Sequence, residues 1–251
     1  MKVLAIIPAR YASTRFTAKP LAMLGGKPIV QRVYEQVSKA VERVVVATDD
    51  ERIFNAVAAF GGEVVMTSKE HRCGTDRCNE ACDKIGFDEG IVINVQGDEP
   101  FVQLEHIELL KRGFENKKTD IMTLATPFAE SDGTEALENP NSPKVAISKQ
   151  GHALYFSRSV VPYLRGVERG EWLQRHTFYK HLGLYAFRRE VLREVTALEP
   201  TPLEQAEKLE QLRWLESGYT IGVGITNTTT IGIDTPEDLE RAEVYLKNHQ
   251  F

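Results

Sequence analysis

Short apolar runs without polar alternation recur along the first half of the chain. They are rich in β-branched side chains and occupy residues 3–7, 43–48, 63–67, 90–95 and 120–125. Such runs are typical of strands that are buried on both faces, as in a parallel sheet. We therefore expect the first half of the chain to build a mostly parallel sheet.

Segments with helical periodicity lie between these runs. Apolar residues recur at every fourth position within residues 27–40, and residues 49–62 begin with acidic capping residues and end with two glycines. Residues 74–86 have a similar pattern and also predict a helix. Because strands and helices alternate, the pattern predicts a doubly wound α/β fold.

The second half of the chain has a different pattern. Residues 143–157 predict two strands joined by a turn at Gln150 and Gly151, and residues 178–189 alternate as in an antiparallel strand with one open face. The chain closes with a helix, a strand and a second helix, predicted over residues 204–216, over residues 220–226 and from Pro236 onward. We expect a single domain over residues 1–251, in which residues 139–190 form a β-rich insertion on the sheet.

The composition narrows the class of protein. A chain of 251 residues with 42% hydrophobic residues can bury its own core and suits a soluble globular protein. The net charge of −5, from 31 cations and 36 anions, disfavours a nucleic-acid-binding surface. Apolar runs stay short of the roughly 18 residues that span a bilayer, and a secretory cleavage pattern is missing. We expect neither a nucleic-acid partner nor a membrane association.

The three cysteines are Cys73, Cys78 and Cys82. An odd number is typical of reduced thiols in the cytoplasm. Cys78 and Cys82, with His71 nearby, also raise the possibility of a zinc site, but no paired Cys-x-x-Cys accompanies them. Their spacing of four places both thiols on one face of a helix, which favours burial as small apolar residues.

A cationic loop follows the first predicted strand, within the stretch IPARYASTRFTAKPL. It carries Arg10, Arg15 and Lys19. Ligands of open α/β sheets bind at the carboxyl ends of the strands, and these cations could hold a polyphosphate there. The loop has no glycine between residues 8 and 19, so it is not a Walker loop. A solvated basic loop is the alternative.

Two aspartates follow apolar strands elsewhere in the chain. Asp98 comes after the strand in VINVQGDEP, and Asp234 comes after the strand in IGIDTPEDLERA. Carboxylates that face phosphates repel them unless a divalent cation lies between, and Mg²⁺ prefers such hard oxygen ligands. As alternatives, Asp98 suits a turn and Asp234 suits a helix N-cap.

Eight segments, in order along the chain, resemble the 3-deoxy-manno-octulosonate (Kdo) cytidylyltransferase family. They are IPARYASTRFTAKPL, ATDDERI, EHRCGTDR, INVQGDEP, ALYFSRSVVP, KHLGLYAFRRE, LEQLR and IGIDTPEDLERA. The resemblance implies a Rossmann-like nucleotide-diphospho-sugar transferase fold with an inserted antiparallel β region. It also implies that CTP and Kdo react with Mg²⁺ to give CMP-Kdo and diphosphate, for lipopolysaccharide biosynthesis, in a cytoplasmic homodimer whose inserted region contributes to the interface.

The same resemblance assigns roles to individual residues. The catalytic residues it implies are Arg10, Lys19, Asp98 and Asp234, and the last two would bind the metal. The CTP-binding residues it implies are Arg10, Ser13, Arg15, Lys19, Gly74, Thr75 and Arg77. The sugar-binding residues it implies are Gln96, Arg158, His181, Tyr185, Glu210 and Gln211.

This sequence departs from the family at two places. Thr17 and Ala18 replace the usual Pro-Gly before Lys19, which removes the glycine that reaches positive φ easily. Cys73 replaces the usual serine before Gly74. Two further functions compete with the implied one: a cytidylyltransferase for a sialic-acid-like sugar, which the motif RYASTR disfavours, and a catalytically silent nucleotide-binding protein on the same fold.

Overall fold

The structure is a computed structural model of the chain, and it describes residues 1–12, 16–228 and 231–248. The chain divides into two compact units. Unit 1 comprises Met1–Glu108, Ala186–Thr196 and Thr230–Phe251, and unit 2 comprises Leu109–Tyr185 and Ala197–Thr229. The predicted insertion thus has residues 139–185 in unit 2 and residues 186–190 in unit 1.

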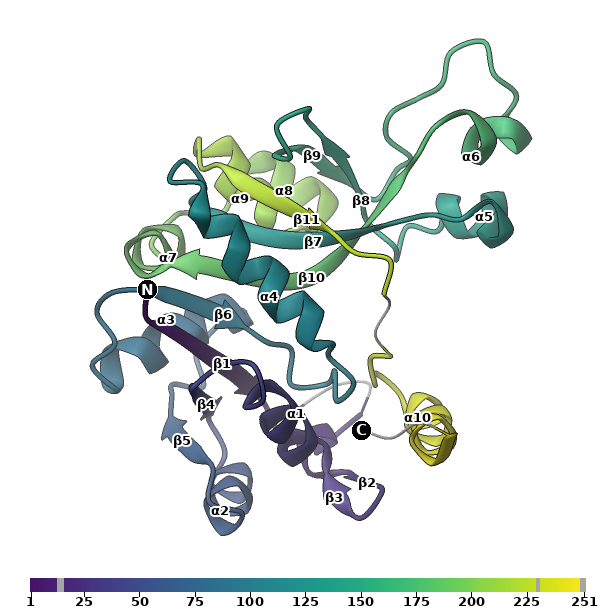
Figure 1. The fold of residues 1–251 in the computed structure, drawn as a ribbon. Coiled ribbons are helices and arrows are strands. Elements are labelled where there is room, and N and C mark those ends of the chain that lie inside the picture. The colour runs from purple at the N-terminus through teal and green to yellow at the C-terminus, as the bar shows by residue number, and fades with distance from the viewer. Residues whose placement is uncertain (13–15, 229–230, 249–251) are drawn as a thin grey trace. The chain divides into compact units, whose positions relative to one another are not determined.

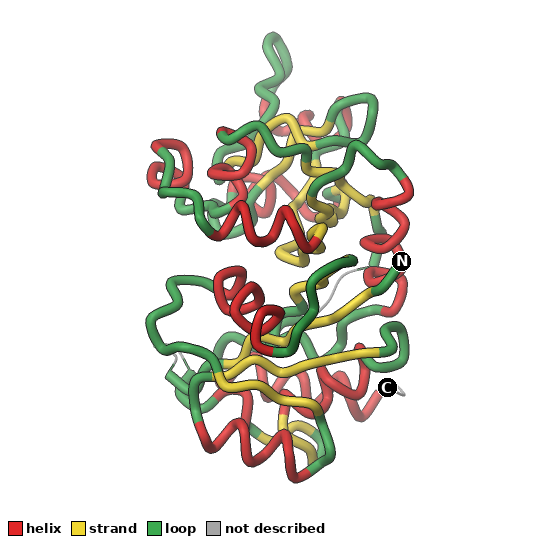
Figure 2. The backbone as a smooth tube through the Cα atoms, turned by 90° about the vertical axis from the view of Figure 1, so that its left-hand side faces the viewer, coloured by secondary structure: helices red, strands yellow, loops and turns green. Residues whose placement is uncertain are grey.

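A parallel sheet forms the core of unit 1 (Figures 1 and 2). Its strands are β1 (Val3–Ala9), β4 (Arg43–Thr48), β5 (Glu63–Met66) and β6 (Ile91–Asn94). β1 pairs in parallel with both β4 and β6, and β4 pairs in parallel with β5, so the order is β6-β1-β4-β5. All of residues 4–7 in β1 are fully buried, which confirms the expected burial on both faces.

The predicted helices α1 (Ile29–Val37), α2 (Glu51–Ala59) and α3 (Gly74–Lys84) separate these strands, and the predicted α10 (Pro236–Asn248) comes last in the described chain. The structure adds α4 (Leu104–Arg112), whose residues up to Glu108 belong to unit 1, α7 (Arg189–Thr196) and the short elements η1 (Lys19–Leu21), β2 (Met23–Leu24) and β3 (Lys27–Pro28). The Asp50 carboxylate accepts the backbone N–H of Arg52 at 2.9 Å, so an acidic residue caps α2 as predicted. Cys78 and Cys82 are fully buried on α3, which confirms their interpretation as core residues.

Unit 2 contains the antiparallel strands predicted for the second half together with a parallel pair. β7 (Ile121–Pro127) pairs in parallel with β11 (Ile221–Ile225). β8 (Lys144–Ile147) pairs antiparallel with β9 (Ala153–Ser157) and with β10 (Tyr179–Arg188), whose residues up to Tyr185 belong to unit 2. Gly151 has a φ of 77° between β8 and β9, so the predicted turn is confirmed.

The single helix predicted over residues 204–216 is wrong. The structure has two helices there, α8 (Pro202–Glu207) and α9 (Gln211–Glu216), separated at Lys208 with a left-handed φ of 53° and ψ of 46°. The carbonyl oxygens of Glu207 and Lys208 accept hydrogen bonds from the Arg158 guanidinium, at 2.6 and 3.2 Å. A distant arginine thus satisfies backbone groups that a continuous helix would pair internally.

A separate apolar cluster of unit 2 lies among its short helices. These are η3 (Glu130–Asp132), α5 (Gly133–Glu138), η4 (Arg169–Glu171) and α6 (Trp172–Arg175), whereas η2 (Gly113–Glu115) contacts β11. Leu137, Trp172 and Phe178 are buried together, and the rings of Trp172 and Phe178 stack with centroids 6.0 Å apart. The cluster gives the loop-rich part of the predicted insertion a hydrophobic core of its own.

Candidate active site

A pocket of unit 1 lies where β1 and β6 end. Its volume is about 390 Å³, and it is lined by Pro8, Ala9, Arg10, Ala12, Lys19, Pro20, Gly74, Gln96, Gly97 and Asp98. The carboxyl ends of neighbouring parallel strands meet at one sheet edge, so segments distant in sequence gather there. The structure therefore brings together five predicted site residues at the predicted edge.

Gly97 allows the segment after β6 to pass close to the end of β1. A Cβ atom on Gly97 would lie 2.8 Å from the carbonyl oxygen of Pro8, which is closer than real Cβ contacts. Sequence reasoning noted Gly97 only as part of the motif and missed this constraint. The signal available was a glycine directly before a predicted metal ligand, at the end of a buried strand.

The Lys19 ammonium lies between the two predicted metal ligands. Its Nζ is 2.6 Å from Oδ2 of Asp98 and 3.1 Å from Oδ1 of Asp234. The Lys19 side chain is only 13% exposed, so these ion pairs are partly shielded from water. A backbone hydrogen bond of 2.9 Å from Ile233 N–H to the carbonyl of Asp98 holds the two acidic segments together.

The first turn of α10 has its own capping residues. The Asp238 carboxylate accepts the backbone N–H groups of Asp234 and Thr235, both at 2.9 Å, and the Thr235 hydroxyl accepts the N–H of Asp238 at 3.3 Å. This arrangement is a capping box at Thr235. Thr235 and Asp238 therefore cap α10 in place of Asp234, and the Asp234 carboxylate pairs with Lys19.

Arg10 is held toward the pocket by the loop before α3. Its Nη2 donates a hydrogen bond of 2.8 Å to the carbonyl oxygen of His71. The two remaining predictions on the cationic loop, Ser13 and Arg15, lie outside the described residues.

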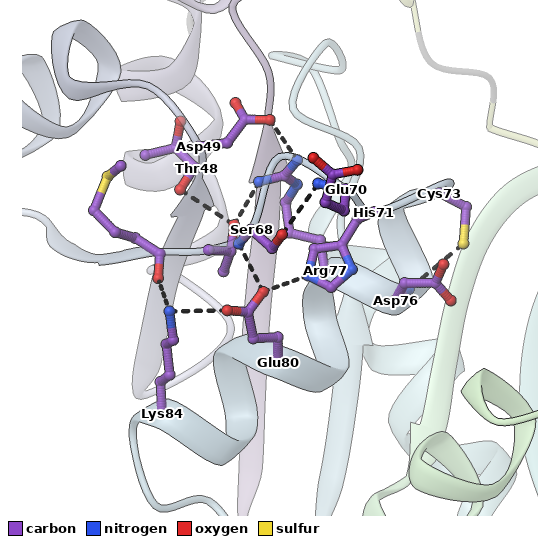
Figure 3. Close-up of polar contacts among 12 residues, drawn as sticks. Thr48, Asp49, Ser68, Glu70, His71, Cys73, Asp76, Arg77, Glu80 and Lys84 are labelled. Atoms are coloured by element: carbon purple, nitrogen blue, oxygen red, sulfur yellow. Dashed lines mark hydrogen bonds and ion pairs between the residues drawn. The ribbon is translucent and has the colours of Figure 1, made fainter.

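The three residues predicted on α3 have different environments. Gly74 lines the pocket, and Thr75 is 2% exposed. Arg77 is fully buried, pairs with Asp49 at 2.7 Å and donates a hydrogen bond to the Thr67 hydroxyl (Figure 3). The structure thus places Arg77 where it ties α3 to the ends of β4 and β5, and its contact with CTP stays a prediction.

His181 and Tyr185 come together in unit 2, as their spacing on one strand predicts. Their ring centroids are 5.4 Å apart, and the Tyr185 ring also packs edge-on against Trp214. The Nε2 of His181 lies 2.9 Å from the Thr123 hydroxyl. Burial lowers the pKa of His181 to about 3 and raises the pKa of Tyr185 well above its ordinary value, so both side chains are neutral near pH 7.

The other predicted sugar-binding residues of unit 2 have protein partners in this structure. The Arg158 guanidinium donates to the carbonyls of Pro140, Glu207 and Lys208. Glu210 accepts a hydrogen bond of 3.1 Å from Arg213, while Gln211 is buried at the start of α9. Their contacts with a sugar stay predictions.

Comparison with known proteins identifies related sequences over the whole chain. The family model described as Cytidylyltransferase matches residues 4–221. A 3-deoxy-manno-octulosonate cytidylyltransferase of Phocaeicola vulgatus is 61% identical over 100% of this chain and 99% of its own. One of the same name from Bacteroides thetaiotaomicron is 60% identical over 99% of both chains.

Solved structures resemble the chain as well. The structure of a CMP:2-keto-3-deoxy-manno-octonic acid synthetase complexed with CTP is 38% identical, with a TM-score of 0.90 over 99% of both chains. A cytidylyltransferase from Leptospira borgpetersenii is 17% identical, with a TM-score of 0.64 over 100% of this chain and 89% of its own, and shares the fold alone. Within the described residues, no helix has both the length and the apolar character to cross a membrane.

Proposed function

The chain belongs to the cytidylyltransferase family, and from this membership we propose that it transfers the cytidylyl group of CTP to Kdo, forming CMP-Kdo and diphosphate. Relatives of 61% and 60% identity carry the name of this activity, and a similar structure holds CTP. One observation in the chain itself carries the proposal. Asp98 and Asp234 converge on Lys19 beside a pocket that Arg10 also lines.

The triphosphate of CTP binds in the pocket of unit 1, between Arg10 and Lys19. A guanidinium offers phosphate oxygens a planar fork, and an ammonium acts as a point charge. Both cations stabilise the negative charge that develops on the leaving diphosphate. Ser13 and Arg15 join them on the strength of the family resemblance.

Mg²⁺ is the proposed cofactor, with Asp98 and Asp234 as its ligands. These residues fit Mg²⁺ because their two carboxylates already lie around one cation, the Lys19 ammonium. Carboxylates are also the hard oxygen ligands that Mg²⁺ prefers. When bound, the ion supplies charge neutralisation at the α-phosphate and lowers the pKa of the attacking hydroxyl. With Mg²⁺ on the two carboxylates, the Lys19 ammonium would be available to bind phosphate oxygens.

The reaction is an in-line substitution at the α-phosphorus of CTP. The oxygen of the anomeric 2-hydroxyl of Kdo forms a bond to this phosphorus. The bond to the bridging oxygen breaks, diphosphate leaves with the electron pair, and the hydroxyl proton passes to solvent. The chain forms no covalent bond to substrate, so its residues act by orienting the reactants and neutralising charge.

Recognition of the sugar is assigned to polar residues that the family resemblance implies. The proposed set is Gln96, Arg158, His181, Tyr185, Glu210 and Gln211. Because His181 is neutral, it can exchange hydrogen bonds with sugar hydroxyls without adding charge beside the Kdo carboxylate. Gln96 contributes from the pocket that binds the triphosphate.

Release of diphosphate from a panel of substrates tests the function. The purified chain is incubated with Mg²⁺, each of the four nucleoside triphosphates and several acid sugars, including Kdo, its 8-amino analogue and a nonulosonic acid. We expect the highest kcat/KM with CTP and Kdo. Faster turnover of the nonulosonic acid would overturn the proposed sugar, and absence of turnover with CTP would overturn the proposed activity.

Asp98→Asn tests the metal-binding carboxylate. The amide keeps the size of the side chain but loses the charge, so we expect kcat to fall by about 10²–10³-fold. The matched control is Glu89→Gln, because the Glu89 carboxylate is 77% exposed and pairs only with the surface residue Lys2 among the described contacts. Equal diphosphate release by both variants would remove Asp98 from the site.

Three further properties complete the proposal. The chain forms a homodimer through residues 139–190, where Leu154 and Tyr163 leave 64% and 70% of their surfaces exposed. It acts in the cytoplasm, which agrees with three free cysteines. Its product serves lipopolysaccharide biosynthesis, as the family resemblance implies.

A further inference from the structure

The loop that positions Arg10 is itself attached to α3. This loop, residues 67–73 between β5 and α3, is called the 67–73 loop below. At its start, Thr67 donates its backbone N–H to the Thr48 carbonyl at 2.8 Å and accepts a hydrogen bond from Arg77. At its end, Cys73 caps α3 by accepting the Asp76 N–H at 3.5 Å.

Glu80 holds the middle of the 67–73 loop (Figure 3). Its Oε2 accepts the backbone N–H of Ser68 at 2.8 Å and a hydrogen bond from Nε2 of His71, and its Oε1 pairs with Lys84 at 2.8 Å. Burial acts to raise the pKa of the Glu80 carboxyl, but the bonds from Lys84, Ser68 and His71 outweigh it and lower this pKa to about 2. Glu80 is therefore ionised at neutral pH, and Nε2 of His71 carries the hydrogen between them.

His71 connects Glu80 to Arg10: its ring is bonded to Glu80, and its backbone is bonded to Arg10. The carbonyl oxygen of His71 accepts the Arg10 Nη2 hydrogen bond of 2.8 Å. The path from α3 to the pocket is thus a carboxylate, an imidazole, a backbone carbonyl and a guanidinium. Glu80 is absent from the described residues that line the pocket, so it acts on a ligand there indirectly, and this path connects it to Arg10.

We propose that Glu80 is a positioning residue that sets the Arg10 guanidinium for the triphosphate, through His71. Resting on the proposed function, this inference specifies how the CTP site is pre-organised. A guanidinium with one nitrogen fixed to a backbone carbonyl loses less rotational freedom on binding phosphate. The remaining nitrogens of Arg10 keep their hydrogens for phosphate oxygens.

Glu80→Gln and His71→Ala test the first two side chains of the path. CTP is titrated calorimetrically into each variant with Mg²⁺ and without sugar, so that no turnover occurs. We expect each variant to weaken CTP binding by about fivefold to tenfold, since each removes a charge-assisted hydrogen bond that orders the loop. The effect should raise KM for CTP while kcat changes less than twofold.

Lys84→Gln is the matched control. Lys84 is the other side-chain partner of Glu80, but it connects to the Met66 carbonyl on β5, not to His71. We expect its CTP affinity to stay within twofold of wild type. Thermal unfolding of every variant shows whether a loss of binding reflects a loss of fold.

A double-mutant cycle with Arg10 separates positioning from a general structural role. In an Arg10→Ala background, Glu80→Gln should change CTP affinity by less than twofold, because the group it positions is gone. Additive losses, or full affinity in both Glu80→Gln and His71→Ala, would overturn the inference. If the wild-type chain failed to bind CTP, the proposed function would fall instead.

Discussion

At the scale of single residues, Ala18 stands out for its backbone. It adopts a left-handed conformation with φ of 60° and ψ of 18°, directly before Lys19. An L-residue with a Cβ pays roughly 1–2 kcal/mol for this conformation, and glycine does not. The chain therefore makes at Ala18 the backbone turn that suits the glycine which the family resemblance implies there, and strain is stored beside the pocket.

Ala18→Gly should relieve this strain. We expect the free energy of unfolding to rise by roughly 0.5–1 kcal/mol, because the gain in the folded state exceeds the added entropy of the unfolded chain. Denaturant titration measures the change. The control is Ala22→Gly, since Ala22 has an extended φ of −62° and ψ of 139° and should lose stability. A loss of stability in both variants would show that Ala18 is not strained.

At the scale of elements, the break between α8 and α9 depends on Arg158. Its guanidinium contacts three carbonyls, and its backbone N–H donates to the Glu207 carboxylate at 2.9 Å. Lys144, fully buried beside it, donates to the carbonyls of Asn139 and Arg158 at 3.0 and 2.7 Å. The two cations thus connect β8 and β9 to the end of α8 through backbone acceptors.

Arg158→Lys should weaken this connection even without substrate. A lysine keeps the charge but cannot reach three carbonyls in a planar fork, so we expect a loss of roughly 1–3 kcal/mol in the free energy of unfolding. The exposed residue Arg165 offers a control, and Arg165→Lys should stay within about 0.5 kcal/mol of wild type. Unchanged stability together with a raised KM for Kdo would assign Arg158 to sugar binding alone.

The strand β10 makes the stability of the chain dependent on pH through His181. Its pKa is about 3 in the folded chain and about 6.5 when unfolded, so the unfolded state binds more protons below pH 6.5. Stability is fully present above pH 6.5 and falls as the pH drops toward 3, by up to about 1.4 kcal/mol per pH unit.

Unfolding in urea between pH 7.5 and pH 5 measures this dependence. The variant His181→Gln keeps a polar side chain at the position but has no proton to gain. We expect a shallower loss of stability for the variant below pH 6.5. Parallel curves for the two proteins would mean that His181 has the same pKa in the folded and unfolded states.

At the scale of the whole molecule, exposed apolar residues of the 139–190 region support the proposed dimer. Replacing Leu154 and Tyr163 together by Glu places two charges on that surface, and we expect the dimer to dissociate, because desolvating unpaired charges opposes association. Sedimentation velocity measures the mass of each species.

Val244 provides a control on another surface. It is 60% exposed on α10, outside the 139–190 region. Val244→Glu should leave the mass at twice that of one chain. Dissociation by this variant would move the interface elsewhere, and a wild-type monomer would remove the homodimer from the proposal.

Much of the fold could be predicted because its information is local. Buried strands such as β1 and β4 appear in the sequence as uninterrupted apolar runs, and an acidic N-cap marks the start of α2. The break at Lys208 could not be predicted, since its partner Arg158 lies 50 residues away. Local periodicity does not record a partner that distant in sequence.

The candidate site, like the fold, could be predicted from the sequence only in part. The sequence by itself determined which segments are candidates for the chemistry, through ordered motifs with Arg10, Lys19, Asp98 and Asp234. The strand predicted before Asp234 is wrong, because residues 231–234 have no regular secondary structure. Only the tertiary structure decided that Lys19 forms ion pairs with both aspartates, which lie 79 and 215 residues away in the sequence. The same holds for the connection from Glu80 to Arg10 through His71. Strand periodicity acts over a few residues, whereas these contacts join a helix, loops and strand ends that lie together only in the folded chain.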